Sequence, residues 1–111
     1  MAAPVSSPQD YFDKLNDRFV AAEAKGVDAT FQYEIGEGRW VVKVEGGQLT
    51  GVEKGTVEKP TLIVTMDPDN FVNMVNGDLD GAKAFMTRKL KVKGNIMLAQ
   101  KMKKFFPPSE K

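Results

Sequence analysis

The chain has 111 residues and a formal net charge of +1, with 41% hydrophobic and 28% charged residues, a balance typical of one globular domain. It contains no Cys and no His, which excludes disulfides, thiol nucleophiles, and both Ser-His-Asp and Cys-His catalysis, and removes the commonest metal ligands. An enzyme of this sequence would depend on carboxylates, Lys, Tyr or a cofactor.

No segment of the sequence has the pattern that directs a protein into or across a membrane. No apolar run approaches the ~20 residues needed to span a bilayer. Residues 1–7 lack the basic start and apolar stretch of a signal peptide, and residues 109–111 do not match the Ser-Lys-Leu peroxisomal address. We therefore expect a cytoplasmic protein with a flexible tail over 1–7, a folded domain over 8–106 and a second tail over 107–111.

One amphipathic helix is predicted over residues 8–25. Ser7 is suited to be its N-cap and Pro8 its first residue. Gly26 is suited to end it. Apolar residues recur at i, i+3 and i+7 and therefore share one helical face: Phe12, Leu15 and Phe19.

Four strands follow, because apolar and polar residues then alternate with a period of two. They are predicted over residues 30–35, 40–45, 48–53 and 62–66. Glycines in the two short connections between the first three strands are suited to tight turns. A polar loop over 55–59 leads to the fourth strand.

Helical spacing returns after the fourth strand. Asp67 and Asp80 are suited to cap two short helices, whose apolar residues are Phe71, Met74, Val75, Ala82, Phe85 and Met86. A fifth strand is predicted over 89–93. A last helix, which Pro107 stops, carries Leu98, Ala99, Met102, Phe105 and Phe106. The order of elements predicts a single α+β domain with most of its helix after the strands.

The small net charge hides an asymmetry along the chain. Residues 1–80 hold 7 basic and 14 acidic side chains, whereas residues 81–109 hold eight basic side chains and no acidic one. The eight are Lys83, Arg88, Lys89, Lys91, Lys93, Lys101, Lys103 and Lys104. This pattern raises the expectation of an anionic partner. The alternative is that the two parts neutralise each other in the folded protein.

Metal, catalytic and nucleic-acid sites have little support in the sequence. Four carboxylates bracket one predicted helix: Asp67, Asp69, Asp78 and Asp80. They could bind a cation or act as paired catalytic carboxylates, but Asp67 and Asp80 stand where helix caps belong, which favours the capping interpretation. The pI of about 7.9 is low for a nucleic-acid-binding domain. We expect no metal, no cofactor and no nucleic-acid partner.

Methionine and phenylalanine concentrate toward the end of the chain. Within 36 residues lie Met74, Met86, Met97, Met102, Phe71, Phe85, Phe105 and Phe106. Such residues either pack a helix layer against a sheet or form a surface that adapts to varied apolar ligands. Their spacing alone leaves both interpretations open.

Several segments carry a family resemblance: Arg39-Trp-Val-Val-Lys-Val44, Asp67-Pro-Asp-Asn-Phe71, Met74-Val-Asn-Gly77, Ala84-Phe85 and Lys89-Leu-Lys-Val-Lys-Gly-Asn-Ile-Met-Leu-Ala99. They resemble the sterol carrier protein type 2 domain, or nonspecific lipid-transfer protein, over residues 8–106. The resemblance implies a five-stranded mixed, mostly antiparallel sheet with helices layered on one face and an apolar tunnel between them. It also implies binding and transfer of fatty acids, fatty acyl-CoA, sterols or phospholipids without enzymatic activity.

The predicted lipid-binding residues combine this resemblance with the apolar stripes: Trp40, Val42, Phe71, Met74, Val75, Phe85, Met86, Leu98, Met102, Phe105 and Phe106. We expect Lys101, Lys103 and Lys104 to contact an anionic headgroup or membrane surface. The partners would be a lipid ligand and, transiently, an anionic membrane, with the protein acting as a monomer. The alternative is an accessory module that presents lipid to a partner enzyme.

Overall fold

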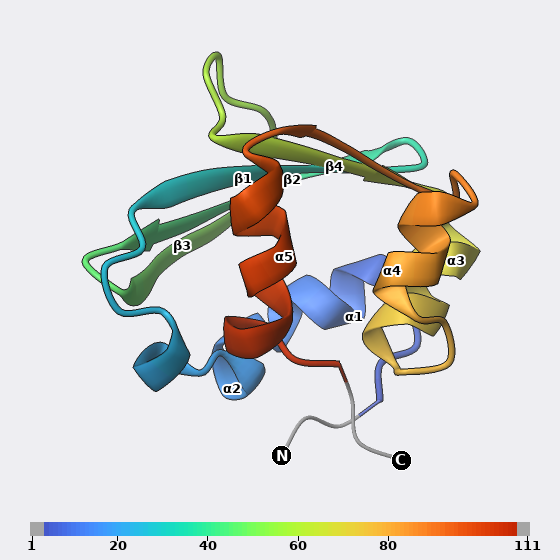
Figure 1. Ribbon diagram of the computed structural model, residues 1–111, viewed down its shortest axis with the longest axis horizontal. Coiled ribbons are helices and arrows are strands. Elements are labelled where there is room, and N and C mark those ends of the chain that lie inside the picture. Colours follow the sequence, from blue (N-terminus) through green and yellow to red (C-terminus); the bar gives the residue numbers. More distant parts are fainter. Residues whose placement is uncertain (1–3, 109–111) are drawn as a thin grey trace.

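Five strands form one mixed sheet in the computed structural model, which describes residues 4–108 (Figure 1). The order across the sheet is β3-β2-β1-β4-β5, and all neighbouring strands are antiparallel except β1 and β4, which are parallel. The strands are β1 (Ala29–Ile35), β2 (Gly38–Glu45), β3 (Gln48–Lys54), β4 (Leu62–Met66) and β5 (Leu90–Gly94). The predicted mixed, mostly antiparallel five-stranded sheet is therefore confirmed.

The helices lie together on one face of this sheet (Figure 1). They are α1 (Pro8–Asp13), α2 (Leu15–Arg18), the 3-10 helix η1 (Ala21–Glu23), α3 (Pro68–Val75), α4 (Gly81–Met86) and α5 (Ile96–Phe105). Between the sheet and the helices lies the hydrophobic core, to which the strands contribute alternate residues: Phe31, Tyr33, Ile35, Trp40, Val42, Val44, Leu62, Val64 and Met66. Within residues 4–108, no helix is long and apolar enough to cross a membrane.

The carboxylates around α3 and α4 act as helix caps, as predicted. The Asp67 side chain accepts a hydrogen bond from the backbone N–H of Asp69 at 3.1 Å, and the Asp80 side chain accepts one from Ala82 at 2.8 Å. No three acidic side chains among residues 4–108 gather closely enough to hold a metal ion. These bonds satisfy helix N–H groups that otherwise lack a partner.

The prediction of one helix over 8–25 is wrong, because the chain bends at Lys14 and again at Phe19. Phe19 and Val20 both adopt extended backbone conformations. The Val20 N–H donates to the carbonyl of Phe105 at 2.9 Å, and the Phe19 ring packs against Phe106 with ring centroids 5.5 Å apart. A continuous helix would forgo these contacts with α5, so tertiary packing outweighs the local helical pattern.

The packed part of the chain begins before the predicted start at residue 8. Val5 is 5% exposed, and its N–H and carbonyl both bond to the side-chain amide of Asn76 at 2.8 Å. Val5 therefore joins the core instead of belonging to a tail. Of the two predicted tails, residues 1–3 and 109–111 lie outside the described residues.

Gly94 explains why the Lys-Gly-Asn sequence occurs where β5 ends. Its φ of +113° is rare for residues with a side chain. A Cβ atom built there would also lie 2.5 Å from the carbonyl oxygen of Thr61 and 3.0 Å from the Leu62 Cα. Only glycine allows the end of β5 to run this close to the neighbouring chain.

Gly94→Ala is expected to lower the free energy of unfolding by about 2 kcal/mol or more, since strained backbone and a steric clash add together. Urea unfolding measures the loss. Gly55→Ala is the matched control, because Gly55 has a similar φ of +127° with no atom within 4 Å of the added Cβ. Equal losses in the two variants would show that the contact with Thr61 contributes nothing.

Candidate functional site

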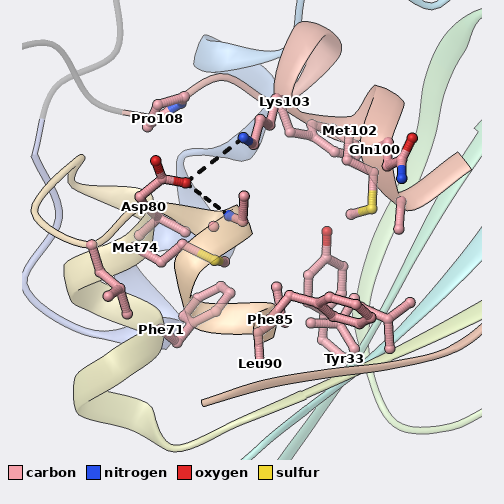
Figure 2. Close-up of a pocket in the computed structure, with 18 of the residues that line it drawn as sticks. Tyr33, Phe71, Met74, Asp80, Phe85, Leu90, Gln100, Met102, Lys103 and Pro108 are labelled. Atoms are coloured by element: carbon pink, nitrogen blue, oxygen red, sulfur yellow. Dashed lines mark hydrogen bonds and ion pairs between the residues drawn. The ribbon is translucent and has the colours of Figure 1, made fainter. Parts of the chain in front are cut away.

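A cavity of about 600 Å³ lies between the sheet and helices α3, α4 and α5. Figure 2 shows it from close range. The sheet contributes Tyr33, Val64, Leu90 and Val92. The helices and their connections contribute Tyr11, Phe71, Met74, Val75, Gly77, Leu79, Asp80, Gly81, Ala82, Phe85, Met86, Ile96, Ala99, Gln100, Met102, Lys103, Phe106 and Pro108. Most of these side chains present carbon or sulfur atoms to the space.

Strand alternation sets the sheet's contribution to the lining. Side chains along a strand point to opposite faces in turn. On the edge strand β5, Leu90 and Val92 therefore face the cavity, whereas Lys91 and Lys93 are exposed. One strand thus supplies apolar lining on one face and positive charge on the other.

The cavity brings together many of the side chains that the sequence predicts as lipid-binding. Those that line it are Phe71, Met74, Val75, Phe85, Met86, Met102 and Phe106, together with the predicted headgroup residue Lys103. They come from α3, α4 and α5, which is where the methionines and phenylalanines concentrate. Their contact with a lipid remains a prediction.

Four predicted residues do not line the cavity: Trp40, Val42, Leu98 and Phe105. Trp40 stacks on Phe12 of α1 with ring centroids 4.7 Å apart, and Val42 is fully buried beside it on β2. The expectation that they face the cavity is wrong because α1 covers this part of the sheet. The cavity lies instead over β1, β4 and β5.

The face of α5 that meets the cavity also differs from the expected one. Phe105 is fully buried in the core, where its ring lies 6.1 Å from that of Phe31, and Leu98 packs against the core. The cavity face of α5 combines Met102, from the predicted stripe, with a mixed set at helical spacing: Ile96, Ala99, Gln100 and Lys103. Leu98 and Phe105 are left to the core because they belong to the most hydrophobic face of the helix.

Several lining residues were missed from sequence: Tyr11, Tyr33, Leu79, Leu90, Val92, Ile96, Ala99 and Gln100. A signal existed for two groups of them. Leu90 and Val92 alternate with lysines on β5, and Ile96, Ala99 and Lys103 recur at i, i+3 and i+7. Tyr33 also had a signal, since it alternates with Gln32 and Glu34 on β1, whereas the position of Tyr11 depends on how α1 packs.

The rim of the cavity is polar and charged. Lys103 Nζ on α5 lies 4.0 Å from Asp80 Oδ1 at the start of α4, and both side chains are mostly exposed. The hydrogen bond from the Ala82 N–H, assisted by the nearby Lys103 charge, lowers the pKa of Asp80 from its usual value. Figure 2 shows this pair beside the open space. The other two predicted headgroup residues, Lys101 and Lys104, are exposed on α5 outside the lining.

Exposed apolar side chains stand at the ends of α4 and α5. Met86 is 80% exposed and Met97 73%, with Phe85 and Ile96 at 46% and 39%. All eight basic residues of segment 81–109 are exposed as well. The apolar side chains at the ends of α4 and α5 therefore have little cover from residues 4–108. The basic residues do not all share their side of the molecule, because Lys91 and Lys93 point to the sheet face opposite the cavity.

Known proteins resemble this chain in sequence and in fold. The SCP-2 sterol transfer family matches residues 11–107. Hydroxysteroid dehydrogenase-like protein 2 of Mus musculus is 38% identical over 97 residues, which cover 83% of this chain and 19% of that protein. The apo form of sterol carrier protein 2 from Yarrowia lipolytica has a TM-score of 0.70 at 24% identity, over 96% of this chain and 95% of that one. A sec-alkylsulfatase from Pseudomonas sp. has a TM-score of 0.76 at 21% identity, over 96% of this chain and 17% of that one.

The two kinds of similarity cover different parts of the matched proteins. The chain spans about a fifth of the length of the curated relatives that it matches. It covers nearly all of the Yarrowia lipolytica structure. Because the family match runs over almost the whole of residues 4–108, the chain belongs to the SCP-2 sterol transfer family.

Proposed function

We propose that this protein binds one lipid molecule in the cavity and transfers it without forming a covalent bond to it. The observation that supports this most directly is the largely apolar space of about 600 Å³ between the sheet and α3–α5. Ligand sites commonly measure roughly 300–1,000 Å³ and are mostly apolar. Membership of the family supports the same activity. The proposed ligands are fatty acids, fatty acyl-CoA, sterols and phospholipids, held in a tunnel-like space.

Burial of methylene groups supplies the free energy for such binding. Each buried CH₂ contributes about 0.8 kcal/mol, so a sixteen-carbon chain offers roughly 12 kcal/mol before the cost of association. The charged lining residues, Asp80 and Lys103, belong to the exposed rim, so an acyl chain would mainly contact carbon and sulfur atoms. Binding and release need no nucleophile or general base.

Titration of the delipidated protein with palmitate tests this proposal. We expect saturable one-to-one binding with a negative heat-capacity change, because apolar surface leaves water on binding. Calorimetry at several temperatures measures both. A protein that gives no saturable heat with palmitate, palmitoyl-CoA or cholesterol would not be a carrier of these lipids.

A cavity-filling variant tests whether the ligand occupies this space. Ala99→Trp should weaken palmitate binding at least tenfold, because the indole would project from α5 into the cavity. Met97→Trp is the control, since Met97 is on the same helix but 73% exposed and outside the lining. Ala82→Trp, on α4, replaces Ala99→Trp if that variant does not fold. Wild-type affinity in the folded cavity variants would place the ligand elsewhere.

We further propose that the cavity mouth meets an anionic bilayer during loading and release. The exposed basic residues of the two helices at the mouth are complementary to such a surface: Lys83 on α4, and Lys101, Lys103 and Lys104 on α5. Each Lys or Arg near such a surface contributes about 1 kcal/mol. The exposed side chains of Met86 and Met97 could enter the headgroup region beside those charges. Lys101, Lys103 and Lys104 would supply charge next to the mouth.

The triple change Lys101/Lys103/Lys104→Gln should slow lipid transfer between anionic vesicles about tenfold or more. Transfer between neutral vesicles should change little, and high salt should reduce the difference, because exposed charges are screened within ~8 Å at physiological ionic strength. The matched control is Lys25/Lys54/Lys59→Gln, which removes the same charge at three exposed positions far from the segment in sequence. Equal slowing in both triple variants would show that transfer depends on the net charge of the protein and not on the position of these lysines. Unchanged transfer would mean that these lysines only offset the negative charge of residues 1–80 and do not contact the membrane.

A second candidate function is that of an accessory module that presents lipid to a partner enzyme. The observation in its favour is that the matched region makes up only 19% of the mouse relative. A presenting module would bind palmitate with the same cavity but would not speed its movement between vesicles. Comparing binding with transfer in the same preparation therefore separates the two functions.

A further inference from the structure

Two tyrosines form the polar part of the inner cavity wall. Tyr11 and Tyr33 both line the cavity, and each is only 3% exposed. The other polar side chains of the lining, Asp80, Gln100 and Lys103, are exposed. The cavity thus has a charged rim and a separate, buried pair of phenol groups.

Packing holds the two tyrosine rings together and in fixed orientations. Both rings contact Phe71 edge to face, with centroids 5.1 Å away for Tyr11 and 6.1 Å for Tyr33. Both also contact Phe12 in the same manner, at 5.1 and 5.0 Å. Such edge-to-face contacts between buried rings favour one orientation for each side chain. The two phenol groups are therefore positioned before any ligand arrives.

The Tyr33 hydroxyl points into the open space between Met74, Phe85 and Met102 (Figure 2). No hydrogen bond joins it to another group among residues 4–108. The Tyr33 hydroxyl is not among the fully enclosed polar atoms without a partner, so water can reach it when the cavity holds no ligand. A purely hydrocarbon ligand would displace that water and leave the hydroxyl without a partner, which costs free energy. The position of this hydroxyl therefore favours a ligand that carries an oxygen acceptor.

Both phenols are held in the neutral, donating form. Burial raises the pKa of Tyr33 well above 10, and the neighbouring Tyr11 raises it further. Burial also raises the pKa of Tyr11, although the Arg18 charge opposes this. A neutral phenol donates one hydrogen bond and suits an oxygen acceptor.

The surroundings favour an uncharged acceptor. A carboxylate moved to this wall would lose its hydration, and burying a charge is costly unless an opposite charge pairs with it. The cation of the lining, Lys103, lies at the rim. The nearest buried cation is Arg18, whose Nη1 already donates to the carbonyls of Val75 and Pro107. An alcohol or ketone oxygen needs no such pairing.

We propose that Tyr33, with Tyr11 beside it, forms an internal hydrogen-bonding subsite for an alcohol or ketone oxygen at the buried end of the lipid. This inference rests on the proposed function, since it assumes that the cavity holds a lipid. It adds an orientation, in which the oxygen-bearing end lies inside and the hydrocarbon extends toward the mouth. It also adds a preference for lipids with an uncharged oxygen over carboxylates at that end.

Tyr33→Phe tests the subsite, because it removes one oxygen and keeps the ring. The probes are four twelve-carbon compounds: 1-dodecanol, 2-dodecanone, dodecane and dodecanoate. We expect the wild-type protein to bind the alcohol and the ketone more tightly than the alkane. Tyr33→Phe should lower that selectivity roughly tenfold, the size expected for one hydrogen bond in a buried site. Competition with a bound fluorescent fatty acid measures all four affinities.

The melting temperature of the ligand-free variant separates a binding role from a structural one. Loss of an unpartnered hydroxyl should leave the stability of the empty protein unchanged or slightly raised. A clear decrease would mean that the hydroxyl already has a partner in the protein, and would overturn the proposal. Tyr11→Phe, measured in the same way, should give a smaller loss of selectivity.

Two other outcomes would overturn the subsite while leaving the carrier function intact. The first is unchanged selectivity for dodecanol over dodecane in Tyr33→Phe. The second is a larger loss for dodecanoate than for dodecanol, which would assign the subsite to a carboxylate. If the wild-type protein bound none of the four probes, nor palmitate, the proposed function itself would fail.

Discussion

Saturating palmitate is expected to raise the melting temperature of the delipidated protein by about 10 °C. A ligand at a hundredfold excess over its dissociation constant adds roughly 2.7 kcal/mol to the stability of the folded state. For a domain of this size, each kcal/mol shifts the melting temperature by roughly 4 °C. Scanning calorimetry of the delipidated protein, with and without palmitate below its micelle concentration, measures the shift.

The physical reason for this large effect is the empty cavity. Side chains that face about 600 Å³ of open space lose the dispersion contacts that neighbouring atoms would provide. A lipid restores those contacts and removes apolar surface from water. Ala99→Trp serves as the internal control, because its melting temperature should respond less to palmitate. The same melting temperature with and without palmitate, palmitoyl-CoA and cholesterol would contradict the carrier function.

The sheet could be predicted well from sequence because its signals are local. Alternation in β1, β2 and β4 fixes which side chains share a face. Asp67 followed by Pro68 marks the start of α3, since the aspartate caps and the proline suits the first turn. These features depend on residues a few positions apart, so no knowledge of the tertiary structure is needed to interpret them.

The path of the chain between α1 and β1 could not be predicted in the same way. Phe12, Leu15 and Phe19 have helical spacing, yet Phe19 ends the helix in an extended conformation. What decides this is the bond between Val20 and the carbonyl of Phe105, 85 residues away in sequence. Such a long-range contact produces no recognisable pattern of apolar and polar residues in either segment.

The sequence predicted which helices line the cavity, but not which side chains of the sheet and of α5 face it. Strand parity places Trp40 on the same face as Tyr33, and both do face the helices. Parity does not say which part of that face α1 covers, and α1 covers Trp40 through Phe12. On α5 the most apolar stripe belongs to the core, so the mixed stripe with Ala99 is left for the cavity.

Arg18→Met is expected to lower the free energy of unfolding by about 3 kcal/mol, because hydrogen bonds to a charged donor contribute roughly 1.5–3 kcal/mol each. Arg18 is 5% exposed. Its Nη1 donates to the Val75 carbonyl at 3.2 Å and to the Pro107 carbonyl at 3.3 Å, and its guanidinium lies 4.9 Å from the centre of the Tyr11 ring. One side chain therefore joins α1, α2, the end of α3 and the segment after α5. Urea unfolding measures the loss.

Arg39→Met is the matched control for this prediction. Arg39 Nη1 also donates to two carbonyls, those of Gly36 and Gly38, at 2.9 and 3.0 Å. Its side chain is 39% exposed, so water can replace the lost bonds and the cost should stay below about 1 kcal/mol. Equal losses in the two variants would show that burial adds nothing to the role of Arg18.

Arg18 also connects stability to the cavity, because two of its partners, Tyr11 and Val75, belong to the lining. If the side chain holds these walls in place, Arg18→Met should weaken palmitate binding as well as stability, even at temperatures where the variant is fully folded. Arg18→Lys keeps the charge but loses the planar guanidinium that can reach two carbonyls at once, so both losses should be intermediate. A variant that is destabilised but binds palmitate with wild-type affinity would restrict Arg18 to the fold and leave the cavity walls to the packing of Phe71 and Phe12.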